Sequence, residues 1–422
     1  MKINLAYGEK GLSIELPDNL TTVITSNYIP GLEDEQAALW YALNKPIEAP
    51  PLRNWFNNKS RVCITFTDIT RATPNHRLIP WILKYLSFVP EKNITLLNSL
   101  GSHRPNTKDE LEKMLTPEVV KRYKIVHNDP ENKESHIKIG TLKDGTPALI
   151  SRYLIESDVR IITGFIEPHF FAGFSGGPKG ILPGVAHMDT IMANHRAENI
   201  SHPKATFGIT EGNPIWEEMR EIALKAGPSF LINVTLNDDK RITGIFAGDI
   251  IAAHKKGTEF VKQNAMQKVK ERFDLVITTN SGYPLDLNLY QGVKGMSAAA
   301  RIVKQGGAII LACECRDGVP FNSAYEKLLH RGKTPEELLQ IINSSKQVIP
   351  EQWQVQIQAQ IQKQATVYLY SSLPEEAVKA AHLIPCKDIE KTVKEIISAR
   401  GDNVKIAVMP QGPLTIPYIE EN

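Results

Sequence analysis

From residue 61 onward, short apolar runs alternate with amphipathic segments, and this alternation limits the possible folds more than any other feature of the chain. An apolar run at 61–68 (RVCITFTD) precedes helical periodicity at 76–88. Further runs (NITLLNSLGSH, KIVHND and DVRIITGF) continue the pattern. Between them, Thr107 and Glu110 form a capping box that predicts the start of a helix. Strands that alternate with helices are typical of an α/β domain with a mainly parallel sheet.

The same alternation restarts in the second half of the chain. After a hairpin (NVTLNDDKRITGIFAGD) and a helix near 250–267, a new strand–loop–helix unit begins at 273–286. It continues with a helix (SAAARIVKQ), a strand (GAIILACEC), two helices within 324–343, and a final βαβ pattern (TVYLYSS, DIEKTVKEIISAR, KIAVMPQG). We expect the glutamines of 352–364 to form the solvated face of another helix. The opening INLAYGEKGLSIEL predicts a hairpin.

The length of 422 residues exceeds what one hydrophobic core usually organises. We therefore predict two α/β domains with mainly parallel sheets, 1–268 and 273–422, divided near 265–272, with an active site in the crevice between them. A net charge of +2 gives no electrostatic footprint for nucleic acid. The start lacks a signal peptide, and no apolar run approaches the roughly 20 residues that span a bilayer. Four sparse cysteines complete the expectation of a cytoplasmic protein without disulfides or a membrane segment.

Polar clusters follow several of the predicted strands. In α/β sheets ligands bind beyond the carboxyl ends of the strands. The residues at such positions are Asp68 and Arg71 (FTDITRATPNHR), His103 (NSLGSHRPNT), His169 (ITGFIEPHFF), and Tyr290, Gln291 and Lys294 (TTNSGYPLDLNLYQGVKG). Each also has a plain structural interpretation: Arg71 as a surface ion pair, His103 as a hydrogen-bonded loop residue, Lys294 as part of a first helical turn. A cation in the first turn of a helix opposes the helix dipole, so Lys294 at such a position favours contact with an anion.

The segment 168–195 (PHFFAGFSGGPKGILPGVAHMDTIMANH) is the most unusual in the chain. It is not a phosphate loop, because Pro178 precedes Lys179 and Gly180 follows it, where that motif needs glycine and a hydroxyl. Glycines allow a bulky group to approach the backbone. Lysine is used for covalent attachment to carbonyl-type cofactors. We expect Lys179 to reach a space that these glycines keep clear.

Two histidines of this segment, His187 and His195, lie eight residues apart, too far for the i, i+4 spacing of a shared zinc. One of them could still be a single protein ligand to a metal whose other ligands come from a cofactor. Imidazole suits nickel, copper, iron and zinc, so the side chain does not choose among these metals. The remaining histidines without such a context are assigned structural or surface roles: His127, His136, His254, His330 and His382.

The motifs DITRATP, GSHRPNT, EPHFFAGFSGGPKGILPG, ANH and YQGVKG together resemble the nickel-pincer lactate racemase family, in order and over nearly the whole chain. The resemblance implies the two-domain α/β fold and a pyridinium-3-thioamide-5-thiocarboxylate mononucleotide that holds nickel in an S–C–S pincer. It implies that this cofactor is joined to Lys179, with the glycines making room for it. His195 would be the protein's nickel ligand in a roughly square-planar site.

By the same resemblance, His103 and His169 would be the acid–base pair, and Arg71 and Lys294 would hold the substrate carboxylate. Asp68, Tyr290, Gln291 and Trp353 would be supporting pocket residues, and His187 would be structural. Removing the α-proton would create a carbanion beside a carboxylate, whereas hydride transfer needs only an electron-poor acceptor. The hydroxyl proton then needs a base that titrates near neutrality, and each enantiomer needs its own histidine.

The implied activity is racemisation of a small 2-hydroxy acid, most simply lactate. Malate, phenyllactate, 2-hydroxyglutarate and sugar acids would use the same groups. A non-catalytic cofactor carrier and a zinc hydrolase that uses His169 and His195 are alternatives of other classes. The implied partners are the substrate and dedicated maturation proteins, because no motif in the chain accounts for making this cofactor.

Overall fold

A computed structural model describes residues 1–57, 59–345, 347–401 and 403–419. The chain folds into two compact units. The larger unit contains Tyr28–His195 and His202–Gln263, and the smaller unit contains Met1–Asn27, Arg196–Ser201 and the chain from Asn264 onward. No helix in the described ranges is long and apolar enough to cross a membrane.

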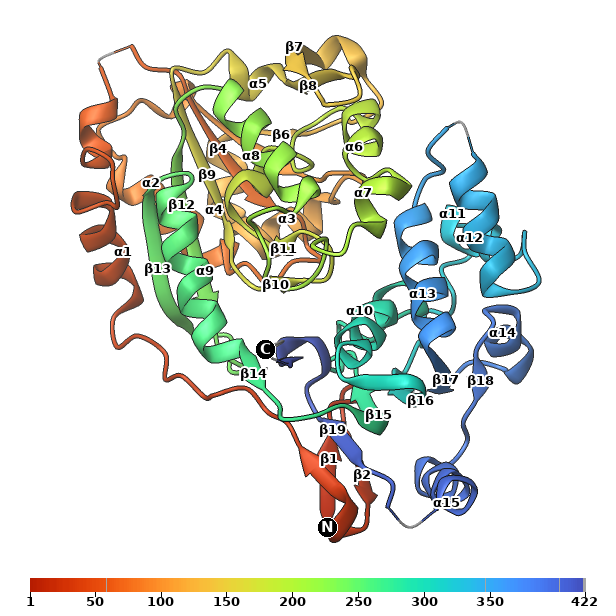
Figure 1. Ribbon diagram of the computed structural model, residues 1–422. Coiled ribbons are helices and arrows are strands. Elements are labelled where there is room, and N and C mark those ends of the chain that lie inside the picture. Colours follow the sequence, from red (N-terminus) through yellow and green to blue (C-terminus); the bar gives the residue numbers. More distant parts are fainter. Residues whose placement is uncertain (58, 346, 402, 420–422) are drawn as a thin grey trace. The chain divides into compact units, whose positions relative to one another are not determined.

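The larger unit is built on a six-stranded sheet (Figure 1). In spatial order it comprises β13 (Ile242–Asp249), β12 (Phe230–Leu236), β9 (Val159–Phe165), β4 (Val62–Thr67), β5 (Ile94–Ser99) and β6 (Lys124–His127). All neighbours pair in parallel except the edge strand β13. The central strands β4 and β9 are apolar and buried along nearly their whole length, as both faces of a parallel sheet require. The segments that follow β9, β4 and β5 therefore emerge side by side at one edge of the sheet.

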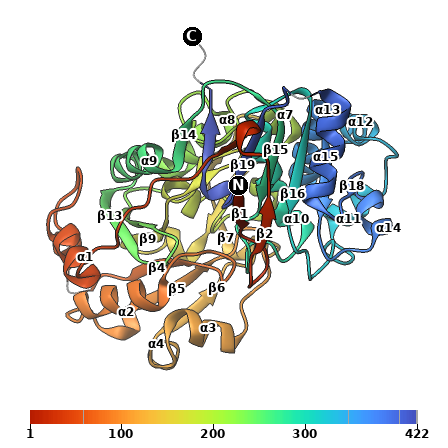
Figure 2. The same cartoon turned by 90° about the horizontal axis from the view of Figure 1, so that it is seen from below.

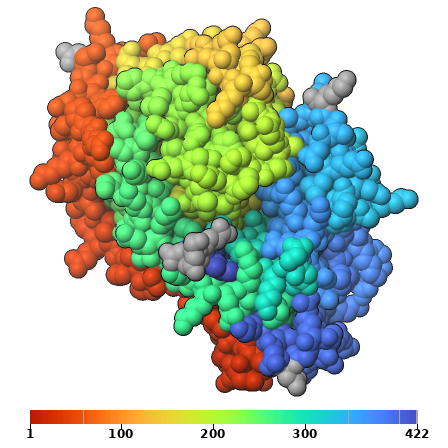
Figure 3. Space-filling model, viewed as in Figure 1, coloured from red at the N-terminus to blue at the C-terminus, as the bar shows by residue number. Residues whose placement is uncertain are grey.

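The helices of the larger unit follow the predicted alternation. They are α1 (Glu35–Asn44), α2 (Asn75–Tyr85), α3 (Lys108–Leu115), α4 (Pro117–Arg122), α5 (Arg152–Ile155), α6 (Met188–Asn194), α8 (Pro214–Lys225) and α9 (Ala252–Ala265). The capping box that starts α3 is confirmed. Two hairpins complete the unit: β7 (His136–Thr141) with β8 (Pro147–Ser151), and β10 (Pro168–His169) with β11 (Gly173–Phe174). Figure 3 shows the first of them, in amber, at the surface.

The smaller unit has its own six-stranded sheet, and all its strands are parallel. In spatial order it comprises β18 (Ile384–Pro385), β17 (Ala365–Tyr370), β16 (Val303–Ala312), β15 (Phe273–Thr279), β19 (Ile406–Met409) and β3 (Thr21–Val23). A further short pair joins β14 (Met266–Lys268) to β20 (Ile416–Tyr418). The helices are α7 (Ala197–Ser201), α10 (Leu289–Ala300), α11 (Ala324–Leu329), α12 (Pro335–Ser344), α13 (Gln352–Gln364), α14 (Glu375–Ala380) and α15 (Ile389–Arg400). The fold class, two mainly parallel α/β units, is as predicted.

The first 27 residues belong to the smaller unit, whereas the predicted boundaries grouped them with the first domain. The predicted hairpin is present as β1 (Lys2–Leu5) and β2 (Leu12–Glu15). Its apolar side chains Ile3, Leu5 and Ile14 belong to the same buried cluster as Ile277 and Val408. Figure 2 shows the hairpin, in red, beside β19. β3 then pairs with β19. This pairing joins segments nearly 400 residues apart, and only tertiary packing determines it.

Two predictions about helices of the smaller unit were wrong. The segment 297–305 is not one helix, because α10 ends at Ala300 and β16 begins at Val303. Pairing of Val303 with Phe273 extends the strand toward the N-terminus. The glutamines in the first half of α13 are not solvated, because Gln356 and Gln358 are fully buried, whereas Gln360 and those after it are partly exposed. The side-chain amides of Gln356 and Gln358 donate to the backbone carbonyls of Ala197 and Ala381. These hydrogen bonds offset the free-energy cost of burying a polar side chain.

Candidate functional site

The turn after β4 places an acidic group at the carboxyl edge of the larger sheet. Asp68 closes the turn with its own side chain, because its Oδ1 accepts the backbone N–H of Thr70 at 2.7 Å. The backbone N–H of Arg71 donates to the Asp68 carbonyl at 3.1 Å. The Arg71 guanidinium then lies 3.8 Å from Oδ2 of Asp68. Asp68 is buried, while the Arg71 side chain is 30% exposed, so the cation faces the accessible side.

His103 reaches the same carboxylate from the turn after β5. Its Nδ1 lies 3.0 Å from Oδ2 of Asp68. With Nδ1–H donating to the carboxylate, the lone pair of the neutral ring is on Nε2. Burial alone would raise the pKa of Asp68, but the hydrogen bond from His103 and the charge of Arg71 outweigh it and hold that pKa well below its usual value. Asp68 is therefore an anion that orients one histidine and one arginine.

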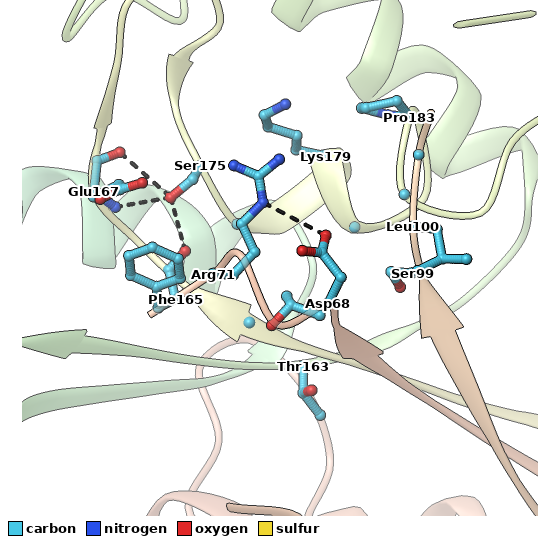
Figure 4. A pocket seen from close by; sticks show the side chains of 16 residues that line it. Asp68, Arg71, Ser99, Leu100, Thr163, Phe165, Glu167, Ser175, Lys179 and Pro183 are labelled. Carbon is cyan, nitrogen blue, oxygen red and sulfur yellow. Dashed lines mark hydrogen bonds and ion pairs between the residues drawn. The ribbon is translucent and has the colours of Figure 1, made fainter. Parts of the chain in front are cut away.

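A pocket opens at this edge of the sheet (Figure 4). Asp68, Arg71 and Lys179 line it together, with the ion pair between Arg71 and Asp68 drawn as a dashed line. The rest of the lining comes from the ends of β4, β5 and β9 and from the glycine-rich segment: Thr67, Ser99, Leu100, Gly101, Thr163, Gly164, Phe165, Glu167, Ser175, Gly176, Gly180, Pro183 and Gly184. The structure thus brings predicted residues from two separate motifs to one cavity of the larger unit.

The Phe171 ring joins Lys179 to the two other histidines of the predicted site. The ring of His169 lies edge-on to Phe171 with centroids 4.5 Å apart, and that of His195 lies edge-on at 5.1 Å. The Nζ of Lys179 is 5.9 Å from the centroid of the same ring. His169 accepts the backbone N–H of Ala172 on Nδ1 at 3.2 Å, so a neutral His169 carries its proton on Nε2. Lys179 belongs to this group and also to the pocket of Asp68 and Arg71.

His195 has the properties of a metal-binding imidazole. It caps the carboxyl end of α6, and its Nδ1 lies 3.0 Å from the Ile191 carbonyl, to which Nδ1–H donates. Burial lowers the pKa of His195 to about 3, and the nearby charge of Lys179 acts in the same direction. The ring is therefore neutral at pH 7, with its lone pair on Nε2. A hydrogen bond from one ring nitrogen to a backbone carbonyl is how proteins usually orient the other nitrogen toward a metal.

His187 caps the start of the same helix. Its Nδ1 accepts the backbone N–H of Asp189 at 3.1 Å and so caps α6, the helix that ends at His195. In the part of the chain that the structure describes, no three His, Cys, Asp or Glu side chains gather in a way that could hold a metal ion. A structural or catalytic zinc site normally takes at least three such protein ligands.

The glycines of the 168–195 segment are required by the protein itself. A Cβ on Gly173 would lie 2.2 Å from the Ile209 carbonyl oxygen, and one on Gly184 would lie 2.3 Å from that of Gly180. A Cβ on Gly180 would lie 2.5 Å from the Ile162 side chain. We expected these glycines to clear space for a bound group. Gly180 and Gly184 do line the pocket together with Lys179, and packing within the protein is a second reason for glycine at these positions.

The remaining predicted residues lie in the smaller unit. Tyr290, Gln291 and Lys294 belong to α10, whose N-cap Asn288 accepts the backbone N–H of Gln291 at 3.1 Å. Tyr290 and Lys294 are four residues apart and so share one face of the helix. The indole N–H of Trp353 donates to the Tyr290 hydroxyl at 3.1 Å. The two aromatic residues are therefore brought together, although little sequence around Trp353 marked it.

Several buried polar residues that support the site were not predicted. Asn213, the cap of α8, donates to the Phe171 carbonyl at 2.9 Å. Glu218, on α8, accepts the side-chain amide of Asn194, the neighbour of His195, at 2.9 Å. Asn233 is another such residue, and it has a local signal in the sequence, because it is a polar residue inside the apolar run FLINVTL. His254 was assigned a structural or surface role, and it is buried beside the glycine-rich segment.

Two family models match the chain. The model of the lactate racemase N-terminal domain covers residues 7–208, and that of the lactate racemase C-terminal domain covers residues 267–416. Between them they take in segments of both units.

Relatives and solved structures agree with these matches. The chain is 39% identical to the lactate racemase of Lactiplantibacillus plantarum over 90% of each chain, and 36% identical to that of Thermoanaerobacterium thermosaccharolyticum over 97% of each. The structure of the lactate racemase apoprotein from the latter organism matches all of both chains with a TM-score of 0.93 at 35% identity. A Thermotoga maritima protein shares the fold, with a TM-score of 0.69 at 18% identity over 93% of this chain and all of that one.

Proposed function

This chain belongs to the lactate racemase family, and on that premise we propose that it interconverts the D and L forms of a small 2-hydroxy acid, most simply lactate. It is a racemase, an enzyme of the isomerase class. The observation that supports the proposed reaction most directly is the position of Lys179. Its side chain is common to the pocket of Asp68 and Arg71 and to the ring cluster of His169 and His195.

The proposed cofactor is the nickel-pincer nucleotide of this family, attached to the Lys179 amine. The residues present fit such a group, because the buried neutral ring of His195 offers Nε2 as one nitrogen ligand and Lys179 lies beside it. When bound, the pyridinium ring supplies a hydride acceptor. The protein supplies the tether, one ligand and the groups that bind the substrate and move its proton.

The acid–base work is assigned to His103 and His169, one for each enantiomer. The Nε2 of His103 takes the hydroxyl proton, and the Asp68 carboxylate stabilises the imidazolium that forms. The contact between the Nδ1 of His169 and the backbone of Ala172 positions the ring and leaves Nε2 as the nitrogen that exchanges a proton with the substrate; His169 gives that proton as the imidazolium. Proton transfer by positioned groups of this kind contributes about 10²–10⁴ in rate.

Arg71 and Lys294 are proposed to hold the substrate carboxylate. A guanidinium can bind a carboxylate through two parallel hydrogen bonds, and an ammonium adds a compact charge. Asp68 keeps the Arg71 side chain near the pocket. Tyr290, Gln291 and Trp353 are proposed to complete the pocket, with the hydrogen bond between Trp353 and Tyr290 fixing the two aromatic rings.

Racemase assays test the proposal. The protein is produced together with the maturation proteins that the family's cofactor requires, and each pure enantiomer of lactate, malate, phenyllactate, 2-hydroxyglutarate and a sugar acid is supplied. Chiral chromatography should show lactate turned over with the highest kcat/KM. Turnover of a larger acid with none of lactate would overturn the lactate assignment. Cofactor-bearing protein that turns over no acid would show a carrier instead of an enzyme.

A further inference from the structure

We propose that His254 is a positioning residue that fixes the loop carrying Lys179, through a hydrogen bond to the backbone of Ser175. This role rests on the proposed function of Lys179. The Nε2 of His254, near the start of α9, lies 2.9 Å from the Ser175 carbonyl oxygen, and His254 is 1% exposed. Since a carbonyl only accepts, the ring donates Nε2–H to it. Ser175 lies four residues before Lys179.

Two neighbours lie against the His254 ring. The Trp216 ring of α8 stacks on it with centroids 6.3 Å apart and an interplanar angle of 16°. On its other contact, a Cβ at Gly177 would lie 2.4 Å from Cγ of the ring, so the Gly177 backbone must rest directly against the imidazole. Gly177 also has a φ of +54°, which glycine adopts at least cost. The loop backbone thus packs directly against the imidazole ring.

A second buried side chain holds the next residues of the loop. The Oδ1 of Asn233, on β12, accepts the Gly177 backbone N–H at 2.8 Å, and Asn233 is fully buried. The backbone N–H of Lys179 then donates to the Gly176 carbonyl at 3.2 Å and begins the short 3₁₀ turn 177–180. One donor from α9 and one acceptor from β12 therefore hold the backbone at Ser175, just before the turn that carries Lys179, and at Gly177, the first residue of that turn.

The choice of polar groups here points to orientation more than to stability. Apolar side chains would fill the same space without desolvating an imidazole and an amide. Burial lowers the pKa of His254 to about 4, so the ring is neutral at pH 7 and donates a single directed hydrogen bond. Buried polar groups that are satisfied in this way define one arrangement of the backbone. A site that must place an amine beside one imidazole ligand needs a fixed loop of this kind.

Hydrogen exchange in the cofactor-free protein tests this role without relying on the cofactor. His254→Phe keeps the volume and the stacking on Trp216 but removes the donor, and His254→Gln restores an N–H at a similar reach. In His254→Phe, the peptide covering 174–182 should exchange about tenfold faster, as loss of a hydrogen bond to a buried carbonyl predicts. In His254→Gln the rate should stay within about twofold of wild type. Equal rates in wild type and His254→Phe would overturn the inference.

Cofactor loading tests the consequence for Lys179. In protein produced with the maturation proteins, intact mass should show the fraction of chains modified at Lys179 reduced about tenfold in His254→Phe and nearly normal in His254→Gln. The control is His382→Phe, which removes an equivalent imidazole–carbonyl hydrogen bond, to Leu329, in the smaller unit. His382→Phe should be modified at Lys179 like wild type. Equal losses of this modification in the two Phe variants would mean that His254 acts only through the stability of the protein.

The two proposals fail in different ways. If wild-type protein carries no modification at Lys179, the proposed function fails, and the exchange experiment still reports on the loop. If wild type is modified and His254→Phe is modified equally, only the role of His254 fails. Should His254→Phe not fold, Asn233→Ala removes the acceptor for the Gly177 amide and carries the same predictions.

Discussion

Asp68 is the residue on which the proposed acid–base chemistry depends most. It is anionic and buried, and it contacts both His103 and Arg71. Asp68→Asn keeps the shape of the side chain but removes the charge that stabilises the imidazolium of His103. We expect kcat to fall roughly tenfold to a hundredfold, with cofactor loading unchanged. Steady-state kinetics on the loaded variant gives the answer, and an unchanged kcat would exclude His103 as a base that relies on Asp68.

The same substitution has a signature in stability. Because the pKa of Asp68 in the folded chain lies below its unfolded value of about 3.9, its ionisation stabilises the fold above that pH. The contribution is lost as the pH falls through the folded-state pKa. Denaturant unfolding should therefore show wild type more stable than Asp68→Asn near pH 7, with the difference shrinking below about pH 4. A difference that does not depend on pH would contradict the assigned shift.

Nickel content and racemase activity distinguish the proposed roles of His103, His169 and His195. His103→Ala and His169→Ala should each reduce racemisation by at least about 10²-fold while nickel stays bound. His195→Ala should lose nickel, because its Nε2 is the proposed ligand. Metal analysis of purified protein, with activity measured on the same samples, separates the roles. Loss of nickel in His103→Ala or His169→Ala would reassign that histidine to the metal.

At the scale of elements, α13 shows how a helix can bury amides. Gln358 is fully buried, and its Nε2 donates to the Ala381 carbonyl at 2.8 Å while its Oε1 accepts from the Tyr325 hydroxyl. Gln364 donates at 2.9 Å to the carbonyl of Ala300, the last residue of α10. The carbonyls near a helix end lack partners within the helix. The glutamines satisfy such carbonyls from a neighbouring helix.

Substitution of one buried glutamine should therefore lower the free energy of unfolding. Gln358→Ala leaves the Tyr325 hydroxyl and the Ala381 carbonyl without this partner, and we expect the free energy of unfolding to fall by about 2–4 kcal/mol. Gln360→Ala, on the more exposed side of the same helix, is the matched control and should change it by less than about 0.5 kcal/mol. Similar small effects in both variants would mean that the buried amides contribute little.

The elements with strong local signals were predicted, and those set by distant contacts were not. The apolar runs of β4, β5 and β9 and the capping box of α3 act over a few residues, so the sequence alone identifies them. The pairing of β3 with β19 depends on residues at opposite ends of the chain. The glutamines of α13 look polar in sequence, and only their distant carbonyl partners explain their burial.

The same distinction applies to the candidate site. The order of strands at one sheet edge made it possible to anticipate that Asp68, Arg71 and His103 lie together. The ring of Phe171 contacts His169, His195 and Lys179, and no local feature of the sequence indicates that role. Asn233 and His254 come from β12 and α9, far from the lysine motif in sequence, and no periodicity links them to it. Their relation to the loop is visible only when the chain is folded.

At the scale of the whole molecule, the chain combines two parallel α/β units, one of which carries the lysine, the histidines and the buried acid of the proposed site. Every assigned role depends on Lys179 being a tether and His195 being a ligand. Without a cofactor at these positions, the acid–base pair would have no hydride acceptor to work with.

The most direct test is the intact mass and peptide map of catalytically active protein, together with its nickel content. We predict a covalent addition located at Lys179 and about one nickel per chain, and we predict that Lys179→Ala lacks the addition and the activity while the exposed-lysine control Lys121→Ala keeps both. Active enzyme that is unmodified at Lys179 and free of nickel would contradict the account.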